Sequence, residues 1–170
     1  TEQVVNAVSN AWIDGGAPGP DGDSPPRTMP RTAKIPASRR TEPITALAFS
    51  PDGTQLAVGR HQLVELMRVS DESIIRSWKN LSGKVECVSF SADGTWVVAG
   101  TGITGFSGEA IGWRVDDGSE VLRVGGHRDT LYAATLSRDA KLLATAGYDR
   151  RIELWDLTTQ NTPAHTITEH

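Results

Sequence analysis

One motif recurs three times in this chain of 170 residues, and its spacing constrains the fold more than any other feature. The motif FSPDGT begins at Phe49, returns as FSADGT at Phe90, and returns in a weaker form, LSRDAK, at Leu136. The first two copies start 41 positions apart, and the second and third start 46 positions apart. A self-similar period of about 40–45 residues is typical of a chain built from repeated four-stranded β-sheets.

The third copy lies within the most informative stretch, residues 126–156, which opens with Gly-His and closes with Trp-Asp. Between these marks lie three short apolar runs, at 131–136, 142–145 and 152–155, and turn residues divide them. Apolar runs of this length, bounded by Gly, Asp and Ser, predict strands joined by hairpins. The Asp-Gly pairs in the first two copies suit tight turns, because Gly adopts positive φ easily. In the third copy Ala140 replaces that Gly, so we expect its turn to be strained or of another type.

The Gly-His and Trp-Asp marks at this period resemble the WD-repeat family, whose repeats form the blades of a β-propeller. The resemblance covers about 43–170; it is most complete in the third repeat and degenerate in the first, where Met67 stands in place of Trp. It implies an all-β fold, a partial β-propeller of three four-stranded antiparallel blades, preceded by a short helix and an extended linker. The expected blades are at about 43–80, 84–125 and 130–168.

The first 42 residues differ in composition from the propeller segment at 43–170. Apolar residues at near-helical spacing predict a helix over 1–17, as the tail of an upstream domain, and Pro, Gly and basic residues predict a linker over 18–42. Basic stretches can bind phosphates, but this linker has no aromatic residue to stack a base, and we favour a solvated connector. Residues 12–18 resemble the end of the c-type cytochrome domain that precedes WD repeats in planctomycete-type proteins. Its haem-binding Cys and His would lie before Thr1, and we expect this chain, which starts without Met, to be a fragment.

Composition weighs against several classes of function. The formal net charge of −4 is too small to argue for nucleic acid, and no apolar run approaches the roughly 20 residues of a membrane helix. We therefore expect no nucleic-acid partner and no membrane span in this chain. The single cysteine, Cys87, excludes an internal disulfide and a C-x-x-C-H haem motif within this chain, and it aligns with small inner-strand residues, which predicts an inert core position. The four His residues lack zinc-ligand spacing, so we expect no metal and no cofactor.

By resemblance, His127, Thr145, Asp149 and Trp155 match the hydrogen-bonded structural tetrad of the family. A buried Trp must find an acceptor for its indole N–H, and a buried polar network must be satisfied. A His beside an Asp could also indicate catalysis. We favour the structural role for these residues. The first two repeats lack the Gly-His pair, and we expect them to hold together by apolar packing alone.

A second motif, GTGITG at 100–105, fits the Gly-rich pattern of dinucleotide-binding proteins. That function requires the motif to open a helix whose N-terminus holds the pyrophosphate, and no helix is predicted here. The interpretation we favour is a long loop inserted between strands at 96–99 and 110–115. No set of nucleophile and base appears, so we expect no catalytic residues and no enzyme activity in these blades.

These observations predict a non-enzymatic WD-repeat scaffold that binds protein partners through loops at one rim of the propeller. The candidate partner-binding residues are Arg60, His61, Phe106, Arg128, Tyr148 and Arg150. The alternative is a docking module of a larger c-type cytochrome electron-transfer protein, whose haem domain lies upstream; this would imply a periplasmic or cell-envelope location. Three blades leave apolar faces at both ends, so we expect the remaining blades to come from the parent chain or from self-association.

Overall fold

The structure is a computed structural model that describes residues 42–159 and 163–168. The predicted helix at 1–17 and almost all of the predicted linker at 18–42 lie outside these residues. The described part is all β, as predicted, and it contains no helix that is long and apolar enough to cross a membrane. Its ten strands are β1 (Ala46–Phe49), β2 (Gln55–Arg68), β3 (Ile74–Phe90), β4 (Trp96–Ile103), β5 (Ser107–Arg114), β6 (Glu120–His127), β7 (Leu131–Leu136), β8 (Leu142–Gly147), β9 (Arg151–Asp156) and β10 (Pro163–Thr168).

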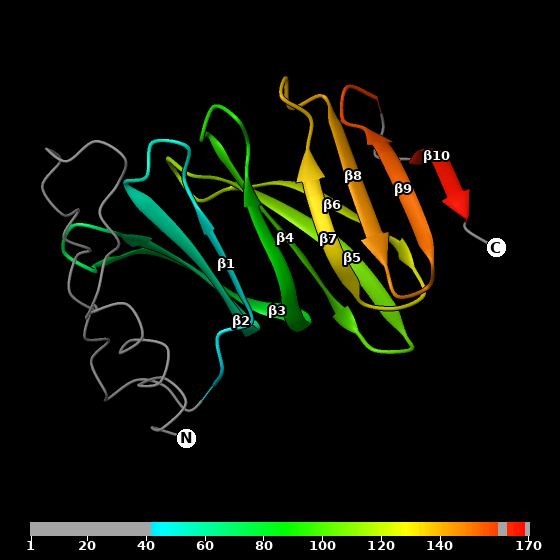
Figure 1. Ribbon diagram of the computed structural model, residues 1–170, viewed down its shortest axis with the longest axis horizontal. Helices are drawn as coiled ribbons and strands as arrows, with labels where there is room; N and C mark the ends of the chain where they lie inside the picture. Colours follow the sequence, from blue (N-terminus) through cyan, green and yellow to red (C-terminus); the bar gives the residue numbers. More distant parts are fainter. Residues whose placement is uncertain (1–41, 160–162, 169–170) are drawn as a thin grey trace, which may run out of the picture. The chain divides into compact units, whose positions relative to one another are not determined.

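The last four strands form one antiparallel blade in the order β10-β9-β8-β7 (Figure 1). Leu143 pairs with Trp155 across β8 and β9, and Leu136 pairs with Leu143 across β7 and β8. The strand β7 has the bounds of the apolar run predicted at 131–136. The pattern is readable here because each strand is short and each turn carries Gly, Asp or Ser.

The first six strands form one continuous sheet, and this sheet contains two blades (Figure 1). The long strand β2 folds back on itself, because the Val69 N–H, just after its end, donates to the Thr54 carbonyl just before its start at 2.9 Å. The turn lies at Gln62, whose φ is 55°. The long strand β3 pairs with β2 in its first half and with β4 in its second half, so it passes from the first blade to the second. Counted by blade, the sheet therefore supplies two sets of four strands.

Two hydrophobic clusters hold the three blades together. One contains Val64 and Val97 and lies between the first and second blades; the other contains Val98 and Leu143 and lies between the second and third. Val97 and Val98 are neighbours on β4 and both are fully buried, because successive side chains of a strand point to opposite faces. Fully burying a side chain of this size contributes about 1.5–3 kcal/mol. The strand β4 of the second blade is thus buried on both faces, which explains its continuous apolar run.

The recurring Ser-x-Asp motif forms the turn between the first and second strands of each blade. In the first blade the Thr54 N–H donates to Asp52 Oδ1 at 3.0 Å, and the Gln55 N–H donates to Ser50 Oγ at 2.9 Å. The Ser50 hydroxyl also donates to the Asp52 carboxylate, and this bond is the main reason why the pKa of Asp52 is lowered to about 2. The motif therefore recurs because its polar side chains satisfy the turn backbone.

Ala140 adopts the same turn as the two glycines that it replaces. Its φ is 54°, beside 70° at Gly53 and 74° at Gly94, and its N–H donates to the Ser137 carbonyl at 2.9 Å as theirs do to the matching serines. Left-handed backbone costs an L-residue about 1–2 kcal/mol, because Cβ crowds the neighbouring carbonyl oxygen. The turn is accordingly strained and is not of another type.

The prediction of a long loop between the second and third strands of the second blade is wrong. Most of that segment continues the two strands as a hairpin, with Thr101 paired with Glu109 and Ile103 paired with Ser107. Only residues 104–106 lie outside the strands, and Gly105 has a φ of 69°. The glycines that looked like a nucleotide-binding loop sit in or between strands, and Gly102 leaves no room for a Cβ, which would lie 2.3 Å from the Ser107 carbonyl oxygen.

The first two blades are not joined by apolar packing alone, which corrects the prediction from sequence. Trp78 stacks on Trp113 with ring centroids 4.9 Å apart, and its indole N–H donates to the Gly118 carbonyl at 2.9 Å. Arg76 Nε donates to the Val115 carbonyl at 3.0 Å. Backbone carbonyls at strand ends are free acceptors, so side chains of a neighbouring strand can satisfy them without a Gly-His pair.

Replacing Ala140 with Gly is expected to raise the free energy of unfolding by about 1 kcal/mol, because Gly accepts positive φ without crowding. Urea unfolding of the full chain measures this change. Ala144→Gly on β8 is the matched control and should lower stability, since Gly weakens a strand interior. A loss of stability in Ala140→Gly would contradict the strain that we infer from φ.

Candidate functional site

The four residues of the predicted tetrad lie in one chain of hydrogen bonds. The Trp155 indole N–H donates to Thr145 Oγ1 at 3.0 Å, and Thr145 Oγ1 lies 2.9 Å from His127 Nε2. His127 Nδ1 lies 3.0 Å from Asp149 Oδ1. Every group is satisfied if the His proton is on Nδ1, so that Nδ1 donates to the carboxylate and Nε2 accepts from the hydroxyl.

The repeat motif places these side chains on four different segments. His127 ends β6, Thr145 lies on β8, Asp149 lies in the β8–β9 turn, and Trp155 lies on β9. The chain of hydrogen bonds therefore ties the end of the second blade to the interior of the third. Gly147 makes room for it, because a Cβ at that position would lie 2.8 Å from both Asp149 Oδ1 and His127 Nδ1.

Asp149 ends the chain of hydrogen bonds in the turn between β8 and β9, and its side chain is 7% exposed. Burial by itself would raise the pKa of its carboxyl group, but the hydrogen bonds from His127 and from the Arg128 N–H outweigh that effect, and the pKa is lowered. The Arg151 N–H also donates to Asp149, at 3.2 Å. The carboxylate is thus held ionised between two loops and the imidazole.

The order Asp, His, hydroxyl also occurs in catalytic triads. Here the hydroxyl cannot reach a substrate, because the Thr145 residue is 1% exposed and its oxygen accepts the Trp155 N–H. His127 is 4% exposed. Without an opening of the blade, this cluster can stabilise the fold but cannot attack a bound molecule.

Sequence reasoning missed Glu153, which lies beside the tetrad. Its carboxylate oxygen Oε2 is 3.8 Å from His127 Nε2, its Oε1 is 3.4 Å from Arg151 NH1, and the residue is 3% exposed. The signal was available, because Glu153 is two residues before Trp155 on the same strand and must share its buried face.

Replacing Thr145 with Val is expected to lower the free energy of unfolding by about 1–3 kcal/mol, because the isosteric change leaves the Trp155 N–H and His127 Nε2 buried without this partner. Thermal or urea unfolding measures the loss. Thr135→Val, at an exposed position on β7, is the matched control and should change stability by less than about 0.5 kcal/mol. Equal effects of the two substitutions would show that the hydrogen-bond chain does not stabilise the fold.

The contribution of Asp149 to stability should depend on pH in one direction. Its folded pKa lies below the ordinary value, so its stabilising effect is fully present above pH ~4 and is lost as the pH falls through the folded pKa. The difference in unfolding free energy between the parent chain and Asp149→Asn should therefore shrink between pH ~6 and pH ~2. The other carboxyl groups are the same in both proteins, so the difference isolates Asp149. A difference that grows with acid would refute this assignment.

The loops around the tetrad are hydrogen-bonded to each other at one end of the strands. We call residues 103–107, 128–130 and 148–150 the rim loops. The Gly105 N–H donates to Asp129 Oδ1 at 2.8 Å, the Tyr148 N–H donates to the Thr130 carbonyl at 3.1 Å, and the Arg128 N–H donates to Asp149 Oδ2 at 2.9 Å. Three loops from two blades thus form one connected surface.

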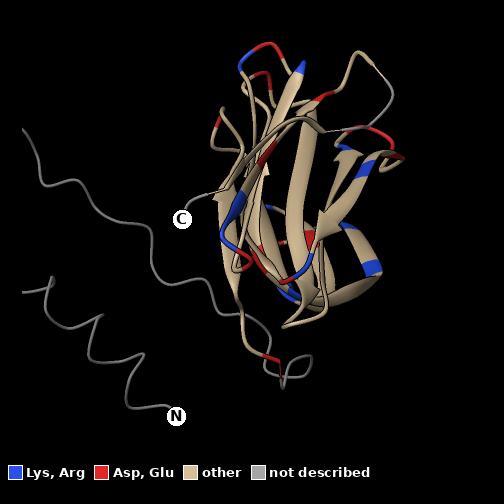
Figure 2. Ribbon diagram, turned by 90° about the vertical axis from the view of Figure 1, so that its right-hand side faces the viewer, with Lys and Arg blue, Asp and Glu red and all other residues tan. Residues whose placement is uncertain are grey.

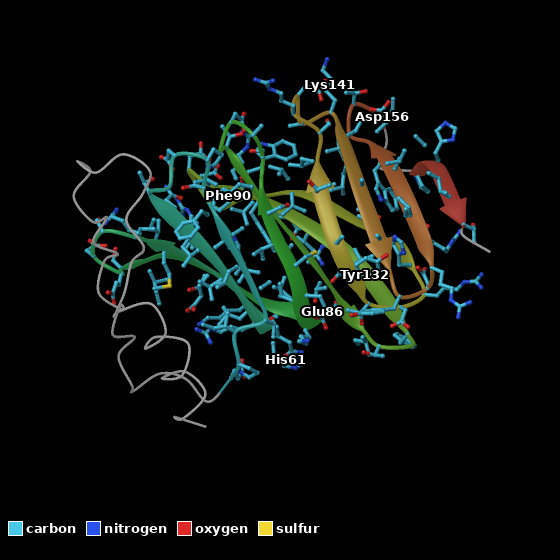
Figure 3. The ribbon with its side chains drawn as sticks, in the orientation of Figure 1. His61, Glu86, Phe90, Tyr132, Lys141 and Asp156 are labelled. Atoms are coloured by element: carbon cyan, nitrogen blue, oxygen red, sulfur yellow. The ribbon has the colours of Figure 1, made fainter. Side chains whose placement is uncertain are left out.

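Four of the predicted partner-binding residues lie on the rim loops, and all four are exposed. Phe106 is 77% exposed and Tyr148 is 60% exposed, and Arg128 and Arg150 are also exposed. His61 is exposed at the turn of β2, where it pairs with Lys84. Figure 3 shows His61, Glu86 and Tyr132 toward one end of the strands, and Phe90, Lys141 and Asp156 toward the other.

Arg60 differs from the other predicted residues, because it is only 4% exposed. Its Nε lies 3.6 Å from Glu65 Oε2, and its NH1 donates to the Glu42 carbonyl at 2.9 Å. The Arg60 side chain, next to the turn of β2, points into the protein, where it interacts with a carboxylate and a backbone carbonyl. A buried guanidinium held by internal groups cannot contact a partner, so we remove Arg60 from the candidate surface.

Two contacts within this surface were not predicted. Asp129 links the first two rim loops, and Tyr132 packs edge-on against Tyr148 with ring centroids 5.3 Å apart. Tyr132 is half exposed on β7. Neither contact has a local sequence signal, because each depends on residues that lie 16 or 24 positions away.

No grouping of three His, Cys, Asp or Glu that could hold a metal ion occurs within the described residues. The thiol of Cys87 is largely buried, and burial raises its pKa to about 11. A thiol with so high a pKa is a poor nucleophile and a poor metal ligand at neutral pH.

The fold and its repeated hydrogen-bonded turns define a propeller protein built from WD repeats. The chain belongs to the WD40 family: the family model described as WD domain, G-beta repeat matches residues 31–66, 70–105 and 118–156. Members of this family generally act as scaffolds for protein interactions.

Two curated proteins are similar in sequence. The anaphase-promoting complex subunit cdc20 of Dictyostelium discoideum is 28% identical over 131 residues, which are 75% of this chain and 25% of that protein. The WD repeat-containing protein sll1491 of Synechocystis sp. is 28% identical over 120 residues, which are 69% of this chain and 33% of that protein. The chain thus spans between a quarter and a third of these relatives.

Two solved structures share the fold. The WD40 repeats of RRP9 and the structure of U3-55K each give a TM-score of 0.68 at 19% identity. Each match covers 78% of this chain, and 40% or 41% of the other chain. At this identity the likeness concerns the propeller architecture alone.

Proposed function

We propose that this chain is part of a non-enzymatic scaffold that binds a protein partner through the rim loops. The observation that carries the proposal is the hydrogen bonding among these loops, which presents Phe106, Tyr148 and two arginines on a fixed surface. Tyr and Arg are enriched among the residues that dominate binding energy in protein interfaces. Loops held on a rigid sheet lose little conformational entropy when they bind.

A further blade would complete this scaffold, and internal symmetry supports it. In the second blade Ala110, which lies three residues before Trp113, pairs with Val124. Both residues pack against the third blade and are at most 3% exposed. The matching pair in the third blade is Ile152 and Ile167, which are 36% and 49% exposed. Apolar residues at these positions suit contact with another blade, from the parent chain or from a second copy.

The alternative function, a docking module for a c-type cytochrome, rests on residues 12–18, which lie outside the described residues. It stays a prediction. Reading the coding sequence upstream of Thr1 for a C-x-x-C-H motif tests it directly, and the absence of that motif would remove both the electron-transfer role and the envelope location that it implies.

The double substitution Tyr148→Ala with Arg150→Ala is expected to abolish capture of partners that the parent chain retains, because both side chains are exposed and their loss leaves the core intact. Quantitative mass spectrometry of affinity-purified complexes measures the change. Arg138→Ala with Lys141→Ala, exposed in the turn at the opposite end of the strands, is the matched control and should retain the same proteins. An unchanged set of proteins in the rim variant would exclude this surface.

A further inference from the structure

The acidic side chains of the rim loops, Asp129 and Asp149, accept hydrogen bonds from backbone groups of the protein itself. The Asp129 carboxylate accepts the N–H groups of Gly105 and Thr130, each at 2.8 Å. The Asp149 carboxylate interacts with His127 and accepts the N–H groups of Arg128 and Arg151. Asp129 Oδ1 and both oxygens of Asp149 therefore interact with groups of the protein itself.

The basic side chains of the same loops have no such internal partners within the described residues. Within the described residues, the guanidinium groups of Arg128 and Arg150 make no ion pair and no hydrogen bond, and both residues are exposed. Arg123 shows the contrast, because its guanidinium contacts Glu109 at 3.0 Å and Glu120 at 2.8 Å. Figure 2 shows that charged residues of both signs occur along the ends of the sheets, so unpaired arginines are not forced by a lack of acidic residues.

Aromatic residues lie on the rim loops together with these two arginines. Tyr148 is close in sequence to Arg150, and its N–H is bonded to the loop that carries Arg128. The edge-on contact with Tyr132 restricts the Tyr148 ring, and Phe106 projects from the next loop. The exposed surface thus combines two guanidinium groups that make no ion pair within the described residues with the exposed rings of Phe106, Tyr148 and Tyr132.

From this arrangement, and on the basis of the proposed function, we propose that Arg128, Arg150 and Tyr148 bind an acidic segment of the partner protein in which Asp or Glu adjoins an aromatic or aliphatic residue. A guanidinium binds a carboxylate through two parallel N–H donors, and such charge-assisted bonds are roughly twice as strong as neutral ones. The aromatic rings provide the apolar contact for the adjoining residue. The inward-facing Asp129 and Asp149 do not compete for the two arginines.

A nucleic acid fits the surface less well. Phosphate binding draws its affinity from many cations along a strand, and the chain as a whole carries a formal charge of −4. Two unpaired arginines suit two neighbouring carboxylates instead.

The test uses three synthetic 12-residue peptides in which Leu or Phe alternates with Glu, with Gln, or with Lys, and a single-stranded RNA of the same length. Fluorescence anisotropy with the full chain measures binding at low and at high salt. We expect the Glu peptide to bind at least about tenfold more tightly than the Gln peptide, with a preference that weakens in high salt. Equal binding of the Glu and Gln peptides, tighter binding of the RNA, or no peptide binding would overturn the proposal.

Substitutions then assign the preference to the two arginines. Arg128→Glu with Arg150→Glu should weaken binding of the Glu peptide by about tenfold or more and favour the Lys peptide, whereas Arg138→Glu with Lys141→Glu should change either by less than about twofold. Arg128→Gln with Arg150→Gln guards against a folding defect, and its thermal unfolding should match that of the parent chain. If partner capture needs Tyr148 and Arg150 but the Glu peptide is not preferred, the acidic-segment proposal fails and the proposed function stands.

Discussion

A buried indole N–H that must find an acceptor constrains the third blade more than any other group. Trp155 is 2% exposed, and its N–H reaches Thr145 Oγ1 inside the sheet. That oxygen can accept the indole N–H and still donate only if a further acceptor is present, which is the role that His127 Nε2 fills. His127 in turn needs the Asp149 carboxylate to hold its proton on Nδ1. To satisfy one buried donor, the protein thus needs a chain of hydrogen bonds that ends at Asp149, in the turn between β8 and β9.

The central Trp of the second blade makes a different contact. Trp113 is 3% exposed and stacks on Trp78 of the first blade, while Arg76 and Trp78 donate to carbonyls near the β5–β6 turn. This contact joins the first and second blades, whereas the tetrad joins the end of β6 to the interior of the third blade. The degenerate repeats of this propeller are thus joined by other residues than the tetrad, through a ring stack and hydrogen bonds to backbone carbonyls.

What could be predicted from sequence follows the range of the interactions involved. Strands and turns depend on neighbouring residues, so β7 has the predicted bounds, and the turn at Ala140 follows the first of the two predicted outcomes, strain. The tetrad residues were named from a single repeat, and their hydrogen bonds are present, although their stabilising role stays a prediction. The stack of Trp78 on Trp113 depends on how strands of different repeats pack. The burial of the Arg60 side chain depends on how the two arms of the β2 hairpin face each other. No local pattern carries that information.

Asp149 couples the stability of the third blade to the shape of its rim. Its carboxylate holds His127 in the buried chain, and it also fixes the backbone of Arg128 and Arg151 on either side of the exposed surface. Any change that frees this carboxylate would loosen the core contact and misplace the rim loops together. The two effects can be separated only through side chains that project outward, such as Tyr148 and Arg150, because they take no part in the buried chain. In this protein the residue that builds the surface and the residues that present its chemistry are therefore different ones.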